Sequence, residues 1–230
     1  MMNANNHLLS IIIPAYNEAG SITDVISNIP NYLLEQSEII VIDDGSDDNT
    51  YETAKKFNAI VIKHILNRGY GAALLTGFKA ALGDIIITID ADNQNRAEEI
   101  PNLLKPIFDD KADFVIGSRY LGEYHYKIPF TTRLGEKISY FLLGIRFGVK
   151  ILNSQSGFRA FKRTILDDFT PLREEKMAFT IELLTKALKK KYRIIEIPKT
   201  ENERQFGKSK VNRLIDGFNI LYTLLKNLFR

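Results

Sequence analysis

The chain has 230 residues, of which 45% are hydrophobic and 26% charged, and it contains no cysteine. This is the composition of a folded globular protein, so it excludes a disordered or fibrous chain, and the lack of cysteine excludes disulfide scaffolds, thiolate zinc sites and cysteine nucleophiles. The net charge of +3 is uneven, because residues 186–230 hold 12 Lys and Arg against 4 Asp and Glu, which indicates either an anionic partner or a solvated basic surface.

The first half of the chain alternates short apolar runs with segments of helical periodicity. Apolar runs closed by turn residues are typical of strands buried in a parallel sheet, and the alternation predicts an α/β fold with helices on both faces of a mostly parallel sheet. The predicted strands are 9–13, 39–42, 59–63, 84–89 and 113–116, and the predicted helices are 21–29, 50–57, 71–81 and 98–108.

The second half is less regular. It contains a polar loop at 153–159, a strand at 193–197 stopped by Pro198 and a charged loop at 200–210. We expect one domain over residues 1–212, followed by an amphipathic helix within 213–230. The predicted helices of this half are 134–149, which has an unusually bulky apolar face, 179–191 and 214–229.

Polar residues follow several predicted strands directly. The carboxyl ends of parallel strands meet at one edge of a sheet, which is where such sheets bind ligands. Asp90-Ala91-Asp92 follows a buried strand, and its two carboxylates, with the side-chain carbonyl of Gln94, are ligands that suit a hard divalent cation.

Asp43 and Asp44 close the second predicted strand. Their carboxylates are suited to accept hydrogen bonds from a base or a ribose hydroxyl. The alternative is a turn that caps the next helix through Ser46, Asp47 or Asp48, and the two interpretations are compatible because capping would use the later residues.

Basic residues in predicted loops are candidates for binding phosphate groups. Arg68 lies in a glycine-containing turn before a helix, which matches neither a Walker loop nor a dinucleotide fingerprint. For any one of these residues a solvated surface is the better explanation, but together they could neutralise a departing diphosphate. The other candidates are Arg119, Arg159, Arg204, Lys208 and Lys210.

These motifs, taken in order, resemble those of the family 2 glycosyltransferases. The later elements resemble the branch that contains the dolichyl-phosphate mannose and glucose synthases, and the likeness covers about residues 9–212. The motifs are IIPAYNE (12–18), VIDDGS (41–46), NRG (67–69), DADNQ (90–94), GSRY (117–120), SQSGFR (154–159), EIP (196–198) and RQFGKSK (204–210).

The resemblance implies a GT-A fold, a nucleotide-sugar donor such as GDP-mannose or a UDP-hexose, and Mg²⁺ or Mn²⁺ as cofactor. By family analogy the nucleotide-sugar is held by Pro14, Ala15, Tyr16, Glu18, Asp43, Asp44, Arg68, Asp90 and Ala91. The metal ligands would be Asp90, Asp92 and Gln94, and the catalytic set would be Asp92, Arg119, Gln155, Arg204 and Lys210.

In that branch the acceptor is a polyprenyl phosphate. Its phosphate oxygen is largely deprotonated at neutral pH, so it can attack the anomeric carbon with inversion and without a protein base. Asn153 stands where relatives often have an acid, which favours a phosphate acceptor over a sugar hydroxyl. A receiver-like signalling module is a remote alternative, because such modules are much shorter.

Two departures from the family pattern stand out. After Asp92 the family usually continues with a small or apolar residue, Gln, His and Pro, whereas this chain has residues 93–96 as Asn-Gln-Asn-Arg. The chain also shows no signal peptide pattern and ends at Arg230 without the transmembrane helices of some relatives. We therefore expect a cytoplasmic, peripheral protein that meets the membrane through helices 134–149 and 214–229, or forms a homodimer through them, and that binds no nucleic acid.

Overall fold

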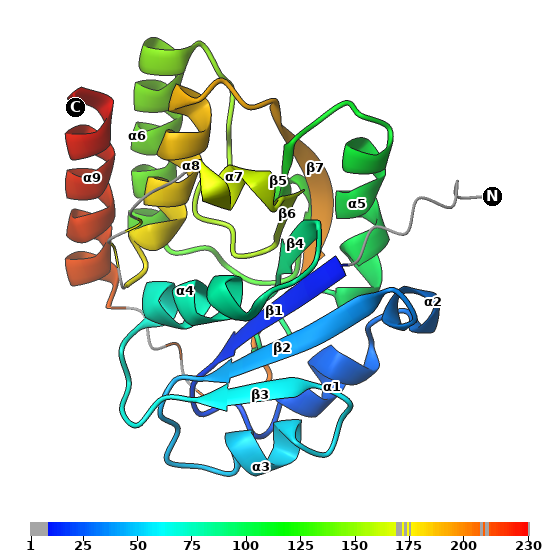
Figure 1. The fold of residues 1–230 in the computed structure, drawn as a ribbon. Coiled ribbons are helices and arrows are strands. Elements are labelled where there is room, and N and C mark those ends of the chain that lie inside the picture. Colours follow the sequence, from blue (N-terminus) through cyan, green and yellow to red (C-terminus); the bar gives the residue numbers. More distant parts are fainter. Residues whose placement is uncertain are drawn as a thin grey trace.

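The structure is a computed structural model that describes residues 9–168, 172, 174, 176–207, 209 and 212–229. Within these residues one mixed sheet lies at the centre of the molecule and helices cover both of its faces (Figure 1). The strand order is β3-β2-β1-β4-β6-β5-β7. The strands are β1 (Leu9–Ala15), β2 (Ser37–Asp43), β3 (Ile60–Lys63), β4 (Ile85–Thr88), β5 (Phe114–Tyr124), β6 (Arg159–Lys162) and β7 (Ile194–Glu201).

The helices lie in two groups, one on each face of the sheet. The first face packs against α1 (Ile22–Ser27), α2 (Asn31–Leu34), α3 (Thr50–Ala54) and α5 (Ile100–Phe108), the last preceded by a 3₁₀ turn at Ala97–Glu99. The second face packs against α4 (Tyr70–Ala80), α6 (Phe130–Phe147), α7 (Thr164–Asp167), α8 (Phe179–Lys189) and α9 (Arg213–Phe229).

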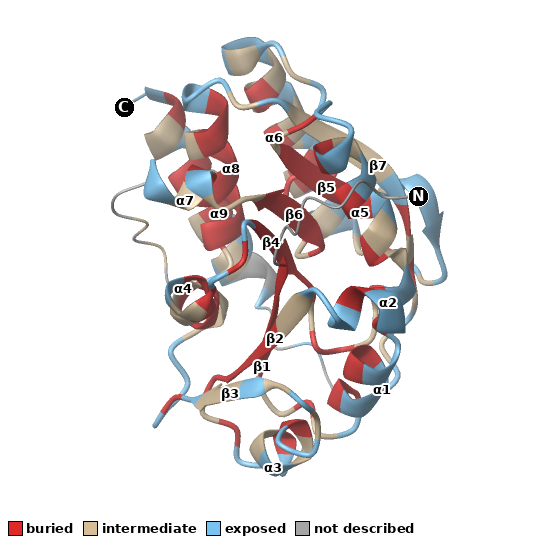
Figure 2. Ribbon diagram, turned by 45° about the vertical axis from the view of Figure 1, so that its right-hand side comes forward, coloured by how far each residue is buried: buried red, intermediate tan, exposed pale blue. Residues whose placement is uncertain are grey.

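The continuous apolar runs of the strands supply both cores. Side chains alternate across a strand, so Ile11 and Ile13 of β1 enter the core under α1 and α5, while Ile12 enters the core under α4. The same alternation holds in β4, where Ile85 and Ile87 take one side and Ile86 the other. Figure 2 shows the resulting band of buried residues through the middle of the sheet.

The register brings the carboxyl ends of three strands to one edge. β1 pairs in parallel with β2, where Ala15 lies opposite Asp43, and with β4, where Ile12 lies opposite Thr88. Asp90 lies two residues beyond Thr88, so it reaches the same edge as the segments that follow β1 and β2. The acidic residues singled out in the sequence therefore meet at one rim.

The sheet differs from the prediction at its far side. β6 was not predicted, because four residues bounded by Arg159 and Lys162 do not form an apolar run; it pairs antiparallel with β4 and β5. The prediction that Pro198 ends the last strand is wrong, since β7 continues to Glu201 with Pro198 opposite Ser118. β7 is an edge strand, where a residue without an N–H is tolerated.

The two long C-terminal helices were placed nearly correctly. α6 begins after Pro129 and ends at Gly148, whose φ of 70° is the left-handed conformation that glycine adopts at helix ends. Ile220 and Leu224 of α9 lie in the same core as α8, so this helix packs on the domain. Among the described residues, no helix combines the length and the apolarity that a membrane crossing requires.

A substitution of Phe161, on β6, would test the packing of the core beneath α4 and α8. Its fully buried ring stacks on Phe114 at 5.1 Å between centroids and meets Phe78 edge-on at 5.7 Å. We expect Phe161→Ala to lower the free energy of unfolding by about 3–5 kcal/mol, measured by denaturant titration. Ile65→Ala, at a fully exposed position, should change it by less than about 0.5 kcal/mol. A small effect at Phe161 would contradict the packing described.

Candidate functional site

The loops that follow β1 and β2 are tied together by hydrogen bonds. The Asn17 N–H donates to Ser46 Oγ at 2.9 Å, the Asp47 N–H donates to Asn17 Oδ1 at 2.9 Å, and the Glu18 N–H donates to Thr50 Oγ1 at 2.8 Å. Ser46 and Asp47, which were candidate helix caps, thus bind the neighbouring loop. Asp48 meets the start of α3, where its carboxylate accepts from the Thr50 N–H at 2.9 Å.

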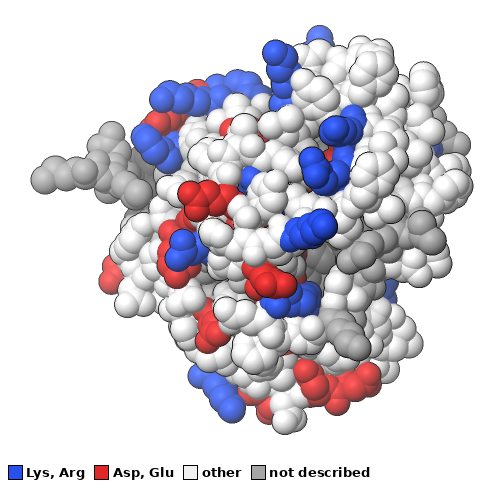
Figure 3. Space-filling model, turned by 180° about the vertical axis from the view of Figure 1, so that it is seen from behind, with Lys and Arg blue, Asp and Glu red and all other residues white. Residues whose placement is uncertain are grey.

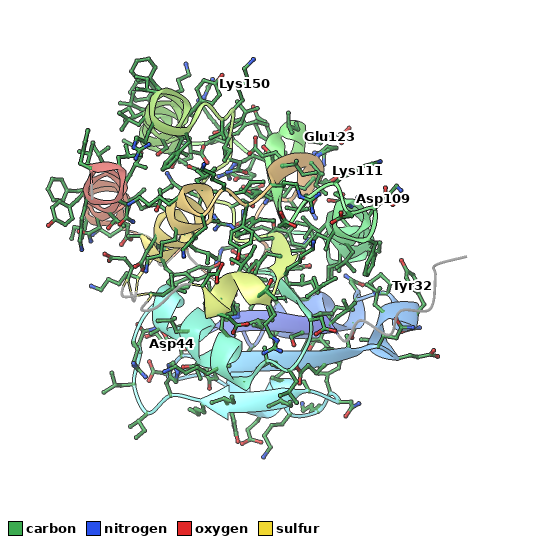
Figure 4. All side chains as sticks on the ribbon, turned by 45° about the horizontal axis from the view of Figure 1, so that its top comes forward. Tyr32, Asp44, Asp109, Lys111, Glu123 and Lys150 are labelled. Atoms are coloured by element: carbon green, nitrogen blue, oxygen red, sulfur yellow. The ribbon has the colours of Figure 1, made fainter. Side chains whose placement is uncertain are left out.

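Asp44 is a buried anchor for the turn at residues 67–69. Its carboxylate accepts hydrogen bonds from the N–H groups of Arg68 at 3.0 Å and Gly69 at 2.7 Å, and it contacts His64 Nδ1 at 2.6 Å. In Figure 4 Asp44 is labelled near the start of α4. Because these partners occupy its oxygens, Asp44 shapes the turn that carries Arg68, and a direct contact between Asp44 and a nucleoside stays a prediction.

Asp43 is fully buried but less fully used. Oδ1 accepts from the Ser46 N–H at 2.9 Å, whereas Oδ2 has no hydrogen-bond partner among the described residues and lies 3.5 Å from the Lys63 ammonium. A buried acceptor without a donor is costly unless a ligand supplies one. Asp43 therefore suits a donor group from a nucleoside.

Asp90 is held by a neutral donor on each carboxylate oxygen. The Tyr70 hydroxyl donates to Oδ1 at 3.0 Å and the Asn95 amide donates to Oδ2 at 3.1 Å. Burial, and then the nearby Asp92 charge, raise the pKa of Asp90 to about 6. A Cβ at Gly157 would lie 2.5 Å from both Asp90 oxygens, so only a glycine can pack this closely against the carboxylate.

Arg204 joins Asp92 to Glu18. Its Nη2 lies 2.8 Å from Asp92 Oδ2 and its Nη1 lies 2.8 Å from Glu18 Oε1. Burial raises the pKa of Glu18 although Arg204 opposes the shift. The ring of Phe206 covers Gly20, since a Cβ there would lie 3.0 Å from it. The segment after β7 thus closes over the loop after β1 and delivers a cation to the rim.

The rim offers a limited set of oxygen ligands for a metal ion. No group of three or more His, Asp or Glu side chains that could hold a metal alone occurs in the part of the chain that the structure describes. Asp90 and Asp92 supply two carboxylates, and Gln94 donates its amide N–H to Asn202 O at 3.1 Å, which leaves its carbonyl oxygen as an acceptor. Two carboxylates at one rim suit Mg²⁺ or Mn²⁺ when substrate phosphates complete the shell.

Arg119 lies in a buried network instead of facing the rim alone. Its guanidinium is 2.6 Å from Glu201 and 3.2 Å from Glu136. The fully buried Asn153 donates to the same Glu136 at 2.7 Å. These carboxylates already neutralise Arg119, and its predicted contact with a phosphate stays a prediction.

The other predicted residues lie in different parts of the structure. Arg159 lies on β6, not in the expected loop, and its buried guanidinium donates to the carbonyl oxygens of Ser154, Ser156 and Thr180; burial lowers its pKa to about 10. Gln155 approaches α6, with Nε2 at 4.0 Å from a Cβ placed on Gly135. Pro14, Ala15 and Tyr16 end β1 or follow it, and Ala91 is buried between the two aspartates. Lys208 and Lys210 lie outside the described residues.

Sequence reasoning missed Tyr70, Asn95 and Lys199. Asn95 contacts both Asp90 and Lys199, and the latter lies on β7, 104 residues further along the chain. The one available signal was the departure from the family pattern after Asp92, which includes Asn95 but does not reveal its partners.

Comparison with known proteins decides the family. The sequence pattern described as "Glycosyl transferase family 2" matches residues 10–170, more than half of the chain. The chain belongs to this family. The match agrees with the resemblance seen in the motifs.

Curated relatives and solved structures extend the comparison over the whole glycosyltransferase. It is 34% identical, over 95% of both chains, to the UDP-N-acetylglucosamine–dolichyl-phosphate N-acetylglucosaminyltransferase of Methanococcus voltae. It is 32% identical to the dolichol-phosphate mannosyltransferase of Pyrococcus furiosus, over 95% of this chain and 64% of the relative. The glucosyl-3-phosphoglycerate synthase of Mycobacterium tuberculosis, solved with Mn²⁺, UDP and phosphoglyceric acid, has a TM-score of 0.77 and 24% identity, over 96% of this chain and 78% of that chain. The predicted GT-A class is confirmed.

The raised pKa of Asp90 gives a testable pH dependence. The ordinary pKa of an aspartate is 3.8, and the pKa of Asp90 in the folded chain is about 6. Between these pH values the native state binds more protons than the unfolded chain, so Asp90 lowers the stability of the metal-free glycosyltransferase as pH rises. The Tm of Asp90→Asn minus the Tm of wild type should therefore be more positive at about pH 7.5 than at about pH 4.5, with both proteins in EDTA. For a chain of this size 1 kcal/mol corresponds to roughly 2–4 °C, which calorimetry resolves.

Asp113→Asn is the control without a pH dependence in this range. Its hydrogen bonds with Arg193 hold the pKa of Asp113 well below the usual range, so this carboxyl is largely ionised in both the folded and the unfolded chain at both pH values, and the Tm difference from wild type should be nearly the same at both. Equal Tm differences at both pH values for Asp90→Asn would show that Asp90 is not perturbed.

Proposed function

We propose that this glycosyltransferase moves one sugar from a nucleotide-sugar to a polyprenyl phosphate, with inversion and with a divalent metal. The proposal rests on the meeting of Asp90, Asp92 and Arg204 at one rim, which offers two metal ligands and a cation to a sugar-bearing diphosphate. Both curated relatives named above carry a dolichyl or dolichol phosphate in their names. Their sugars differ, so the donor proposed here is a class that includes UDP-N-acetylglucosamine, a UDP-hexose and GDP-mannose.

In this proposal Asp90, Asp92 and Gln94 would hold Mg²⁺ or Mn²⁺. The ion would supply positive charge that stabilises the departing nucleoside diphosphate. The nucleoside side of the donor would lie along residues 14–18, with Asp43 accepting a hydrogen bond through Oδ2 and with Arg68 presented by the turn that Asp44 holds. Tyr16 and Ala91 would line the same part of the site.

The reaction needs no protein base. An oxygen of the acceptor phosphate attacks the anomeric carbon, the bond from that carbon to the diphosphate oxygen breaks, and the electron pair leaves with the nucleoside diphosphate. Asn153 supports this route, because a buried amide that already binds Glu136 and the Arg119 backbone cannot accept a proton from a hydroxyl. Gln155 would line the sugar pocket.

The acceptor phosphate requires cations near the rim. Arg204 is the best placed, since it lies beside Asp92, and Lys210 is close to it in sequence. Arg119 is a weaker candidate because Glu136 and Glu201 already balance its charge. Displacing Arg204 from Asp92 when the metal binds would free its guanidinium for a phosphate.

Labelled donors test the proposal. The protein is incubated with a polyprenyl phosphate, Mn²⁺ and labelled UDP-N-acetylglucosamine, UDP-glucose or GDP-mannose, and we expect label in an organic-extractable, acid-labile product with one of them. Asp92→Asn should lower the rate by about 100-fold or more, because a lost metal ligand costs several kcal/mol of transition-state stabilisation. Asp109→Asn, at an exposed ion pair of α5, should keep the wild-type rate.

A product confined to the aqueous phase would contradict the lipid acceptor and favour transfer to a sugar hydroxyl. Mass gain after incubation with a small phosphodonor, without sugar transfer, would instead indicate a signalling module. Full activity of Asp92→Asn would exclude the proposed metal site.

The exposed faces of α6 and α9 support a lipid-facing role. Arg146 Nε of α6 donates to Leu228 O of α9 at 3.1 Å, so the two helices lie together at their C-terminal ends. Large apolar side chains follow a spacing of three or four residues on α9 and lie on one face of α6. They are Phe130, Leu134, Phe141 and Ile145 on α6, and Ile215, Phe218, Tyr222, Leu225 and Phe229 on α9.

Basic residues border this apolar face. Burial and then the neighbouring charges of Arg146 and Lys186 lower the pKa of Lys189, so these three cations lie near one another. Lys150 lines a surface groove of about 320 Å³ together with Phe141 and Ile145. Apolar side chains with a basic rim suit an anionic bilayer surface, so we place the protein on the cytoplasmic leaflet. The face drawn in Figure 3 carries both charge signs interspersed, unlike the continuous basic strip of a nucleic-acid site.

Vesicle binding tests this surface. Phe141→Ser with Phe218→Ser should weaken binding to vesicles that contain phosphatidylserine by tenfold or more, since each buried Phe is worth about 1.5–3 kcal/mol. Leu82→Ser, an exposed apolar residue elsewhere, is the control and should bind as wild type. Unchanged vesicle binding of the double variant, with conversion of a wild-type dimer to a monomer, would assign the face to a second copy of the chain.

A further inference from the structure

Asn95 lies between Asp90 and Lys199 and contacts both. Its Nδ2 donates to Asp90 Oδ2 at 3.1 Å, and its Oδ1 accepts a hydrogen bond from Lys199 Nζ. Asn95 and Lys199 are each only 3% exposed. A buried lysine is unusual in a protein, and this one points its charge at the amide that holds a predicted metal ligand.

The two neighbours of Asn95 leave its amide a single orientation. A carboxylate only accepts hydrogen bonds and an ammonium only donates them, so the amide N–H must face Asp90 and the amide oxygen must face Lys199. Without the ammonium, the amide could rotate and present its oxygen to the Asp90 carboxylate, which would repel it. Lys199 therefore determines which end of Asn95 meets Asp90.

Lys199 is itself fixed by the end of β7. Its ammonium forms an ion pair with Glu201, whose other carboxylate oxygen binds Arg119. The backbone of Glu201 also forms an antiparallel bridge with Asn95. The contacts run in an unbroken series from Arg119 through Glu201 and Lys199 to Asn95.

The same contacts set the plane of the Asp90 carboxylate. Tyr70 donates to Oδ1 and Asn95 to Oδ2, so each oxygen receives one protein donor and keeps a further lone pair. Partners that orient a metal ligand in this way typically change metal affinity by 10–100-fold when they are removed.

We infer that Asn95 and Lys199 are positioning residues that hold Asp90 in the orientation in which it binds the divalent metal. The inference depends on the proposed function, because it takes Asp90 as a metal ligand. It also gives a physical meaning to a departure in the sequence: where the family usually has His after Gln94, this chain has Asn95, and the structure pairs Asn95 with Lys199.

Metal titration tests the inference. The variants are Lys199→Met, which keeps the length of the side chain but removes its charge, and Asn95→Ala. Each should raise the Kd of Mn²⁺ by about 10–100-fold, measured calorimetrically with excess UDP and, separately, with excess GDP. The double variant should weaken binding little more than either single variant, because both break the same series of contacts.

A control variant, a stability measurement and a recovery experiment separate positioning from general destabilisation. Lys162→Met removes a lysine of the same sheet that pairs with Asp113 at 2.8 Å near the amino end of β4, and this control should lose stability without a change in Mn²⁺ affinity. The Tm of every variant is recorded in EDTA. Raising the Mn²⁺ concentration should restore the rate of sugar transfer in Asn95→Ala, since the metal requirement changes and the reaction step does not.

Wild-type Mn²⁺ affinity in Asn95→Ala would overturn the inference, and this variant decides alone if Lys199→Met does not fold. An equal loss of affinity in Lys162→Met would also overturn it. If wild-type protein binds no Mn²⁺ with either nucleotide, the proposed function fails and the inference fails with it.

Discussion

The site depends on gathering several carboxylates at one rim against their mutual repulsion. Parallel pairing of β1 with β2 and β4 brings the acids together, and burial makes each charge expensive. The charge of Arg204 offsets Asp92 and Glu18, and Lys63 lies near Asp43. Backbone N–H groups and His64 hold Asp44. Burial and the nearby Asp92 charge raise the pKa of Asp90, and its described hydrogen bonds come from two neutral donors, so it is the carboxylate that gains most from a divalent cation.

Much of the fold follows from simple periodicity. The triple isoleucines of β1 and β4 predict strands buried on both faces, and the acids directly after them predict the rim. β6 escaped prediction because its short sequence with charged ends is stabilised by two neighbouring strands, which no local pattern reveals. The strand end predicted at Pro198 was wrong for the same reason. A proline is tolerated within β7 because β7 lies at the edge of the sheet, which is a property of the assembled sheet.

The candidate site was predictable in its residues but not in its partners. The sequence predicts that Asp44 and Arg119 contact a ligand. In the structure each already binds another part of the chain, Asp44 by hydrogen bonds and Arg119 by ion pairs. A carboxylate or guanidinium cannot be recognised as engaged until residues distant in sequence are brought beside it. Tyr70 and Lys199 were missed for this reason, since an ordinary tyrosine or lysine carries no sign of a neighbour 20 or 104 positions away.

The short connection between Arg204 and α9 has a mechanical consequence. Nine residue steps separate Arg204 from Arg213, where the helix begins, and a fully extended chain covers at most about 3.6 Å per step, so the Cα atoms of these two residues stay within about 32 Å of each other. A bilayer that bound α9 would therefore keep Arg204, the cation beside Asp92, within about that distance of the lipid headgroups. The cation and the lipid phosphates would then stay near one another while sugar donors come and go.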